Sequence, residues 1–141
     1  MKRLREAVID TNILVYDTFK GSIYHGSAVR LLDELDRWLI PLIVVYEYIW
    51  FLKGLSVDAG TALTKVLEYM ESEKALIIRE EPSGVRWALT TIVEERLSLS
   101  QFNDKIVLYT AIRRSAPLAT YDAKLRQQAV KHGVTVLPEK L

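Results

Sequence analysis

Short apolar runs with strand character alternate along this chain with longer segments of helical periodicity. We expect strands at five places, over residues 7–9, 38–40, 75–78, 118–120 and 134–137. Between them lie segments whose apolar residues recur at helical spacing, such as Ala28, Leu31, Leu32 and Leu35. Two strands joined through a helix run parallel, because the crossover must return over a face of the sheet. The alternation therefore predicts an α/β fold, a three-layer α/β/α sandwich around a parallel sheet.

Periodicity and capping residues together place the expected helices. These helices cover residues 27–36, 42–53, 58–72, 82–97, 100–114 and 122–131. Pro41 fits the first helical position of the second helix, and Gly54 is expected to end it. Asp58 or Ser56 can cap the third helix, and Ser100 can cap the fifth.

The helix 42–53 has an unusual composition. From Pro41 to Leu52 its only charged residue is Glu47. A helix that is apolar on every side is buried on more than one side, so we expect this one to contact a second surface besides its own sheet. Burying a lone carboxylate among such neighbours is costly unless an ion or a partner compensates its charge. Glu47 is therefore a candidate functional residue.

Composition limits the classes of function that remain. The 141 residues contain 19 Lys and Arg against 18 Asp and Glu, so a nucleic-acid site would have to be a local patch. The length suits one domain, and no linker or repeat divides it. The absence of Cys excludes thiolate metal sites, and two His supply zinc poorly. A bound metal ion would therefore have oxygen ligands.

The sequence favours a soluble, cytoplasmic protein. The basic start of the chain is followed by only a short strand before Asp10, which leaves no room for the apolar core of a signal peptide. The longest apolar stretch, residues 39–52, contains Pro41 and Glu47 and is shorter than a membrane span. We expect no membrane contact.

Four acids are expected at the same edge of the sheet. Asp10 and Asp122 follow the first and fourth strands, and the carboxyl ends of parallel strands share one edge. Asp104 lies in the first turn of the helix that precedes the fourth strand, and that turn lies at the same edge. Glu47 leans back toward it, because helical side chains tilt toward the N-terminus. The four carboxylates are therefore predicted to converge.

Each of these acids also has a simpler structural explanation. Asp10, Asp104 and Asp122 sit where helix caps are favoured, so each could serve only as a cap or a turn residue. Against this, two carboxylates about 4 Å apart repel by about 4 kcal/mol at an effective dielectric constant near 20. Either some stay protonated or a cation lies among them. Oxygen ligands favour Mg²⁺ or Mn²⁺, and such a site suits phosphodiester hydrolysis.

The same residues carry a resemblance to a known family. The run Val8-Ile9-Asp10-Thr11-Asn12, Glu47 in an apolar helix, Asp104 at the start of a later helix, and Thr120-Tyr121-Asp122 resemble the motifs of PIN-domain nucleases. Their spacing is most similar to the VapC-type toxins of prokaryotic VapBC toxin-antitoxin pairs. The resemblance spans the whole chain and implies a single PIN-like domain, residues 1–141, with a five-stranded parallel sheet of order 3-2-1-4-5.

The resemblance also implies an activity and a set of site residues. It implies an endoribonuclease that depends on Mg²⁺ or Mn²⁺, with Asp10, Glu47, Asp104 and Asp122 as the metal-site acids. Asn12 and Thr120 would orient the carboxylates or a water. A small VapB-like antitoxin and a homodimer are the implied protein partners. Lys105 departs from the pattern, and it could either neutralise the site or bind phosphate.

Two alternatives to the toxin hypothesis remain open. The chain could be a stand-alone PIN nuclease in RNA processing, or a PIN-like module that binds RNA or protein without cleaving. If it is a toxin, we expect its antitoxin to lay an apolar segment along the helices beside the cleft, including the one that starts near Ser27. We also expect that antitoxin to direct an Arg or Lys toward the four acids.

Overall fold

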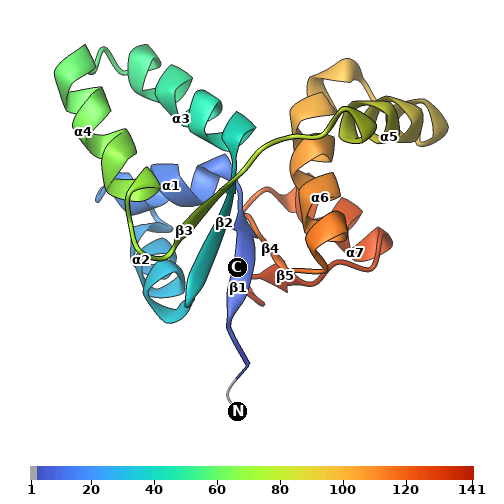
Figure 1. Ribbon diagram of the computed structural model, residues 1–141, viewed down its shortest axis with the longest axis horizontal. Coiled ribbons are helices and arrows are strands. Elements are labelled where there is room, and N and C mark those ends of the chain that lie inside the picture. Colours follow the sequence, from blue (N-terminus) through green and yellow to red (C-terminus); the bar gives the residue numbers. More distant parts are fainter. Residues whose placement is uncertain (1–2) are drawn as a thin grey trace.

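The computed structural model describes residues 3–141 and contains a five-stranded parallel sheet of order β3-β2-β1-β4-β5 (Figure 1). Helices α1 to α4 lie on one side of this sheet and α5 to α7 on the other, which confirms the expected architecture. The elements are β1 (Glu6–Ile9), α1 (Thr11–Thr18), α2 (His25–Glu34), β2 (Arg37–Pro41), α3 (Leu42–Gly54), α4 (Ala59–Met70), β3 (Ala75–Ile78), α5 (Pro82–Glu94), a 3-10 turn η1 (Leu99–Gln101), α6 (Phe102–Arg114), β4 (Leu118–Ala119), α7 (Ala123–Lys131) and β5 (Val136–Leu137).

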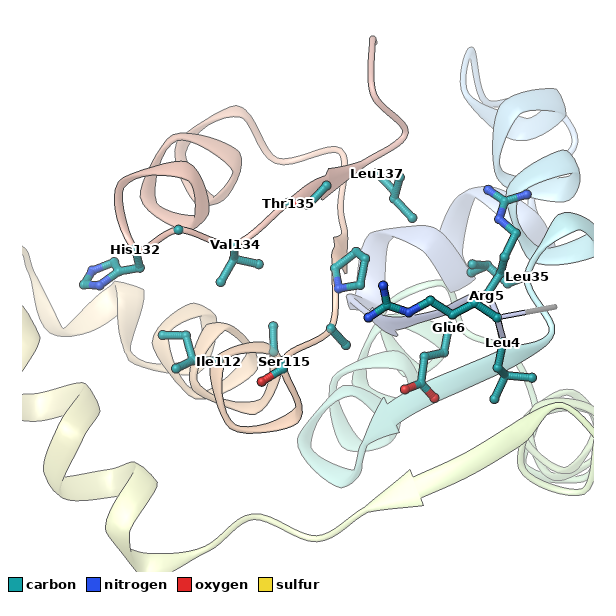
Figure 2. Close-up of a pocket in the computed structure, with 15 residues that line it drawn as sticks. Leu4, Arg5, Glu6, Leu35, Ile112, Ser115, His132, Val134, Thr135 and Leu137 are labelled. Atoms are coloured by element: carbon teal, nitrogen blue, oxygen red, sulfur yellow. The ribbon is translucent and has the colours of Figure 1, made fainter. Parts of the chain in front are cut away.

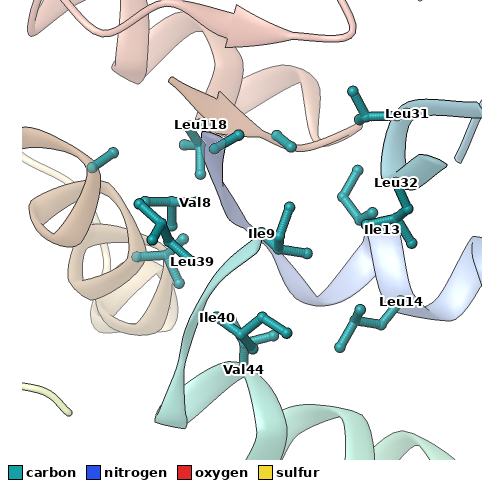
Figure 3. Close-up of a cluster of buried hydrophobic side chains, with 14 of the residues drawn as sticks. Val8, Ile9, Ile13, Leu14, Leu31, Leu32, Leu39, Ile40, Val44 and Leu118 are labelled. Atoms are coloured by element: carbon teal, nitrogen blue, oxygen red, sulfur yellow. The ribbon is translucent and has the colours of Figure 1, made fainter. Parts of the chain in front are cut away.

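The central strand β1 organises the core. It pairs in parallel with β2 on one side and β4 on the other. Side chains alternate along it, so Val8 and Ile9 point to opposite faces of the sheet (Figure 3). Ile9 packs toward Ile13 and Leu14 of α1, while Val8 faces the side covered by α6. A strand buried on both faces is apolar throughout, which is why β1 reads as an uninterrupted apolar run.

Helix α1 cannot be distinguished from β1 by hydrophobic pattern. Its residues Ile13 and Leu14 are buried and continue the apolar run of the strand. The only local signal for a new element is the sequence Asp10-Thr11-Asn12, which is compatible with either a turn or a helix start. The structure resolves this choice, because α1 begins directly after Asp10.

Several element boundaries differ from those expected. Helix α2 begins and ends two residues before the expected 27–36, and β5 is two residues shorter at its start. Helix α5 ends at Glu94 rather than near 97, because Arg96 adopts a left-handed conformation with φ 55°. The prediction that Ser100 caps the fifth expected helix is also wrong. Ser98 accepts a hydrogen bond from the backbone of Ser100 and caps η1, which precedes α6.

The glycines near the ends of α3 and α7 behave differently. Gly133 follows α7 with φ 76°, the left-handed conformation that favours glycine. Gly54 instead remains the last helical residue of α3, and the left-handed position after that helix belongs to Ser56, with φ 59°. Of the two proposed caps for α4, Asp58 is the one used, since its side chain accepts a hydrogen bond from the Thr61 backbone. Across residues 3–141, no helix combines the length and apolar character needed to cross a membrane.

Candidate active site

A cleft at the carboxyl ends of β1 and β4 brings all four predicted acids together. It has a volume of about 300 Å³ and is open to solvent. Its lining residues are Asp10, Thr11, Asn12, Val15, Tyr16, Glu47, Phe51, Asp104 and Asp122. The acids come from four separate places: the β1–α1 junction, α3, the first turn of α6 and the start of α7. Chain topology therefore concentrates negative charge at one edge of the sheet.

Asp10 is both a helix cap and a wall of the cleft. Its carboxylate accepts hydrogen bonds from the Thr11 backbone at 2.8 Å and from Oγ1 of Thr120 at 2.7 Å. Only 5% of the residue is exposed. Burial raises the pKa of Asp10 to about 6, and the nearby Glu47 and Asp122 carboxylates add to the rise against the opposing hydrogen bonds. The capping role and the cleft position therefore coexist.

Asn12 and Thr120 form a hydrogen-bonded bridge beneath the acids. Nδ2 of Asn12 donates to Oγ1 of Thr120 at 3.1 Å, and Oδ1 of Asn12 accepts from the Tyr121 backbone at 3.1 Å. The Thr120 hydroxyl also accepts from the Asp122 backbone at 3.1 Å while donating to Asp10. One hydroxyl thus links two of the four acids. Whether Asn12 and Thr120 orient carboxylates around an ion stays a prediction.

Glu47 is held by two side chains that sequence reasoning did not assign to the site. Its Oε1 accepts from Oγ1 of Thr11 at 2.6 Å, and its Oε2 accepts from Nδ2 of Asn103 at 3.2 Å. Both donors sit immediately beside a predicted acid in the sequence, Thr11 after Asp10 and Asn103 before Asp104. That adjacency is the signal by which they could have been found.

Sequence reasoning also missed two aromatic residues that line the cleft. Tyr16 lies four residues after Asn12, and Phe51 lies four residues after Glu47. Residues four apart share one face of a helix, so helical spacing from the predicted site residues Asn12 and Glu47 would have identified both. They give a highly acidic cleft an apolar rim.

Asp104 is the acid with the largest resolved pKa shift in the cleft. Partial burial, together with the carboxylates of Asp10, Asp122 and Glu47, raises its pKa to about 7, against the opposing charge of Lys105. Asp122 is more exposed, and its Oδ1 caps α7 by accepting from the Leu125 backbone at 3.0 Å. The metal-free cleft therefore retains protons near neutral pH.

The donor chemistry of the cleft suits a hard divalent cation, although the side chains do not form a ready-made site. The charged groups on its walls are carboxylates, the ligands that Mg²⁺ and Mn²⁺ prefer. A cation would also relieve the repulsion that raises the pKa of Asp10 and Asp104. Within residues 3–141, however, no three His, Cys, Asp or Glu side chains are arranged so that they could hold an ion together.

Lys105, which the sequence left as a residue that could neutralise the site or bind phosphate, does not line this cleft. It is fully buried, and its Nζ donates to Oε1 of Glu95 at 2.7 Å. A buried and paired ammonium is not available to bind phosphate. Its charge nevertheless lowers the pKa of Asp104.

A larger cavity lies at the opposite edge of the sheet. It has a volume of about 610 Å³ and is bordered by Leu4 and Arg5 before β1 and by Val134 and Thr135 before β5 (Figure 2). The four acids are not among its described lining residues. The largest of these cavities is therefore not the one in which the four predicted acids converge.

Comparison with known proteins defines the class to which this fold and cleft belong. The PIN-domain family model matches residues 7–131, so the chain is a member of the PIN-domain family. No curated protein sequence gives a significant match.

Solved structures share the fold at low sequence identity. The sarcin-ricin loop-cleaving toxin VapC20 of Mycobacterium tuberculosis has a TM-score of 0.73 and 16% identity over 86% of this chain and 94% of its own. VapBC2 of Rickettsia felis, bound to a DNA fragment from its promoter, has a TM-score of 0.67 and 19% identity, over 93% of this chain and 96% of its own. FitAcB of Neisseria gonorrhoeae has a TM-score of 0.62 and 18% identity, over 94% of this chain and 97% of its own. The structural neighbours thus include VapC toxins and VapBC complexes.

Proposed function

We propose that this protein is an endoribonuclease that depends on Mg²⁺ or Mn²⁺, and that it is the toxin of a toxin-antitoxin pair. The observation that carries the proposal is the convergence of Asp10, Glu47, Asp104 and Asp122 on one cleft. Membership of the PIN-domain family supports a nuclease, and the toxin and toxin-antitoxin structures among the neighbours support the biological role.

The four carboxylates would hold the ion, and other residues of the chain would hold the carboxylates. A bound divalent ion would supply Lewis-acid chemistry for phosphodiester hydrolysis, by activating a water and neutralising charge on the phosphate. Thr11 and Asn103 fix the Glu47 carboxylate through their hydrogen bonds. Thr120 and the first amide of α1 fix Asp10. Preorganised donors of this kind keep the negative charges in place when substrate arrives.

Cleavage of a panel of structured RNAs tests the activity directly. We expect cleavage with Mg²⁺ or Mn²⁺, none with excess chelator, and none with the Asp10→Asn variant under any condition. RNA binding without cleavage, at any concentration of either ion, would instead identify a non-cleaving PIN module. Metal-dependent cleavage by a protein that has no small partner encoded beside it would favour a stand-alone nuclease.

The proposed antitoxin has a suitable docking surface between α3 and α4. This α3–α4 groove has a volume of about 480 Å³, and its apolar lining includes the exposed side chains of Ile49 and Leu63. Helix α3 also supplies Glu47 and Phe51 to the cleft, so a segment in the groove could continue into the cleft. The outer face of α2, which presents Arg30 and other charged residues, is less suited to an apolar segment.

An antitoxin arginine directed into the cleft should compete with the metal ion. Its guanidinium can pair with two carboxylates at once and keeps its charge when it is desolvated. We therefore expect inhibition to weaken as the concentration of Mn²⁺ rises. Reversing the charge of that arginine should restore cleavage, while pull-down through the α3–α4 groove persists.

A matched variant of this protein separates the groove from the cleft. Leu63→Glu places a charge in the groove, so it should abolish antitoxin capture and leave cleavage unchanged. Inhibition that is insensitive to Mn²⁺ would contradict the proposed arginine. Co-purification from the native operon without any small partner would contradict the toxin role itself.

We also propose a homodimer formed through α3. Outside the α3–α4 groove, this helix exposes the large aromatic side chain of Tyr46, which is 53% accessible. Such exposure on a helix with so few charges is typical of a surface that another subunit covers. Light scattering at micromolar concentration should therefore report a dimer, and Tyr46→Asp should convert it to a monomer.

A second exposed apolar position provides the control for the dimer. Leu89 lies on α5, and 41% of it is accessible. Leu89→Asp should leave the dimer intact if α3 forms the interface. A monomeric wild-type protein would contradict the dimer, and dissociation by Leu89→Asp alone would move the interface to α5.

A further inference from the structure

Glu95 gathers three basic side chains where three helices meet. Its carboxylate accepts a hydrogen bond from Nζ of Lys105 at 2.7 Å, lies 3.1 Å from Nε2 of His132 and lies 3.6 Å from Nζ of Lys131. Glu95 directly follows α5, Lys105 lies in the first turn of α6, and the other two lie at the end of α7. One carboxylate therefore ties together the ends of the three helices on this side of the sheet (Figure 1).

The contact between Glu95 and Lys105 is a buried ion pair. Lys105 has no exposed surface, and the Glu95 side chain is only 12% exposed. Burial alone would raise the pKa of Glu95, but the hydrogen bonds from Lys105 and His132 lower it below its usual value. A buried ammonium is tolerated only with such a partner. The pair therefore anchors the start of α6, which carries Lys105, to Glu95 at the end of α5.

Asp104 depends on this anchor more than the other acids do. Asp10, Glu47 and Asp122 each accept at least one hydrogen bond that holds the carboxylate in place. Among the hydrogen bonds of residues 3–141, none is accepted by the Asp104 carboxylate. The position of that carboxylate therefore follows the backbone of the first turn of α6, where the neighbouring Lys105 is anchored.

We propose that Glu95 is a positioning residue for the nuclease site: by holding Lys105, it fixes the first turn of α6 and so places Asp104 in the cleft. The proposal rests on the nuclease function proposed above. Apolar residues of similar size could stabilise the fold equally well. A short charge-assisted hydrogen bond adds direction, because it restricts rotation and sliding of α6 in a way that apolar contacts do not.

A double variant separates positioning from stability. Glu95→Gln with Lys105→Met removes both charges and keeps similar side-chain volumes, so we expect the melting temperature to stay near that of the wild type. Because Asp104 is less well placed, we expect Mn²⁺ affinity in calorimetry to fall by about tenfold or more. The kcat for RNA should fall while KM stays within about twofold. Val66→Ala, in the core contact of α4, controls for a general loss of stability.

A metal-free measurement keeps the inference distinct from the proposed function. Amide hydrogen exchange of residues 102–106 should be faster in the double variant without Mn²⁺, and exchange in β1 should be unchanged. If the wild type neither binds Mn²⁺ nor cleaves RNA, the proposed function fails, and the exchange difference alone then decides whether the pair fixes α6.

A conservative variant covers the case in which the double variant does not fold. Glu95→Asp keeps the charge but shortens its reach by one methylene, so Mn²⁺ affinity should fall severalfold in a folded protein. At least one of these variants should fold. If that variant has the Mn²⁺ affinity, the kcat and the amide hydrogen exchange of the wild type, the pair is only structural and the inference is wrong.

Discussion

Asp10→Asn is expected to eliminate RNA cleavage and divalent-ion binding while the protein stays folded. The substitution keeps the shape of the side chain and removes one ligand charge from the cleft. Changing residues that merely orient metal ligands costs about 10–100-fold in affinity or activity, so losing a ligand should cost more than about 100-fold. Asp122→Asn should have the same effect, since it removes another carboxylate from the same cleft.

The same variant should not destabilise the metal-free protein. A shift of the Asp10 pKa from 3.8 to about 6 corresponds to a cost of about 3 kcal/mol for the ionised side chain at neutral pH. Asparagine removes that cost, and its side-chain oxygen can still accept from the Thr11 backbone. We therefore expect the melting temperature without metal to rise or to remain unchanged.

Asp58→Asn is the matched control for this stability measurement. Asp58 also caps a helix, but hydrogen bonds from the backbone and side chain of Thr61 lower the pKa of its exposed carboxyl. Replacing it should therefore lower the melting temperature and leave cleavage intact. If Asp10→Asn lowers the metal-free melting temperature as Asp58→Asn does, Asp10 serves mainly as a structural cap.

The metal-free protein should melt at a lower temperature at pH 8 than at pH 5. The pKa values of Asp10 and Asp104 are raised to about 6 and about 7, above the values of the unfolded chain. The folded state therefore holds protons that the unfolded state has released, and its stability falls as pH rises through these values. For a domain of this size, we expect a decrease on the order of 5–10 °C.

Divalent ions should reverse this pH dependence. Binding requires deprotonated carboxylates, so Mn²⁺ should stabilise the protein more at pH 8 than at pH 5. At about one hundred times its dissociation constant, a ligand adds about 2.7 kcal/mol of stability. Scanning calorimetry of the wild type and of Asp10→Asn with Asp104→Asn, with and without Mn²⁺, checks both points. A melting temperature that rises from pH 5 to pH 8 without metal would contradict the assigned repulsion.

The parallel sheet and the position of the cleft follow from strong signals in the sequence, whereas the strand order was expected only from the resemblance to PIN-domain nucleases. Alternation of apolar strands with helices dictates a parallel sheet, and a parallel sheet dictates which strand and helix ends share an edge. Asp10 and Asp122 could be placed at that edge from strand ends alone. Asp104 and Glu47 required only the direction of their helices and the tilt of helical side chains.

The details that were not predicted depend on contacts between distant residues. The hydrogen bonds from Thr11 and Asn103 to Glu47 join segments 36 and 56 residues apart. Adjacency to Asp10 and Asp104 marks the two donors, but no local pattern indicates that both donate to Glu47. The burial of Lys105 depends on Glu95 ten residues earlier and on where α5 ends. Helix α5 ends where Arg96 adopts a left-handed conformation, which cannot be predicted from an arginine in the sequence.

The first half of the chain supplies two of the four acids, and the second half supplies the other two. Asp10 and Glu47 precede the crossing from β3 to α5, and Asp104 and Asp122 follow it (Figure 1). A nascent or clipped chain that ends at this crossing contains only two of the four charges. If the protein is the toxin we propose, a ribosome can therefore synthesise the first half without releasing an active nuclease. Likewise, two fragments separated at residues 79–81 would have to associate before the four acids could form one cleft.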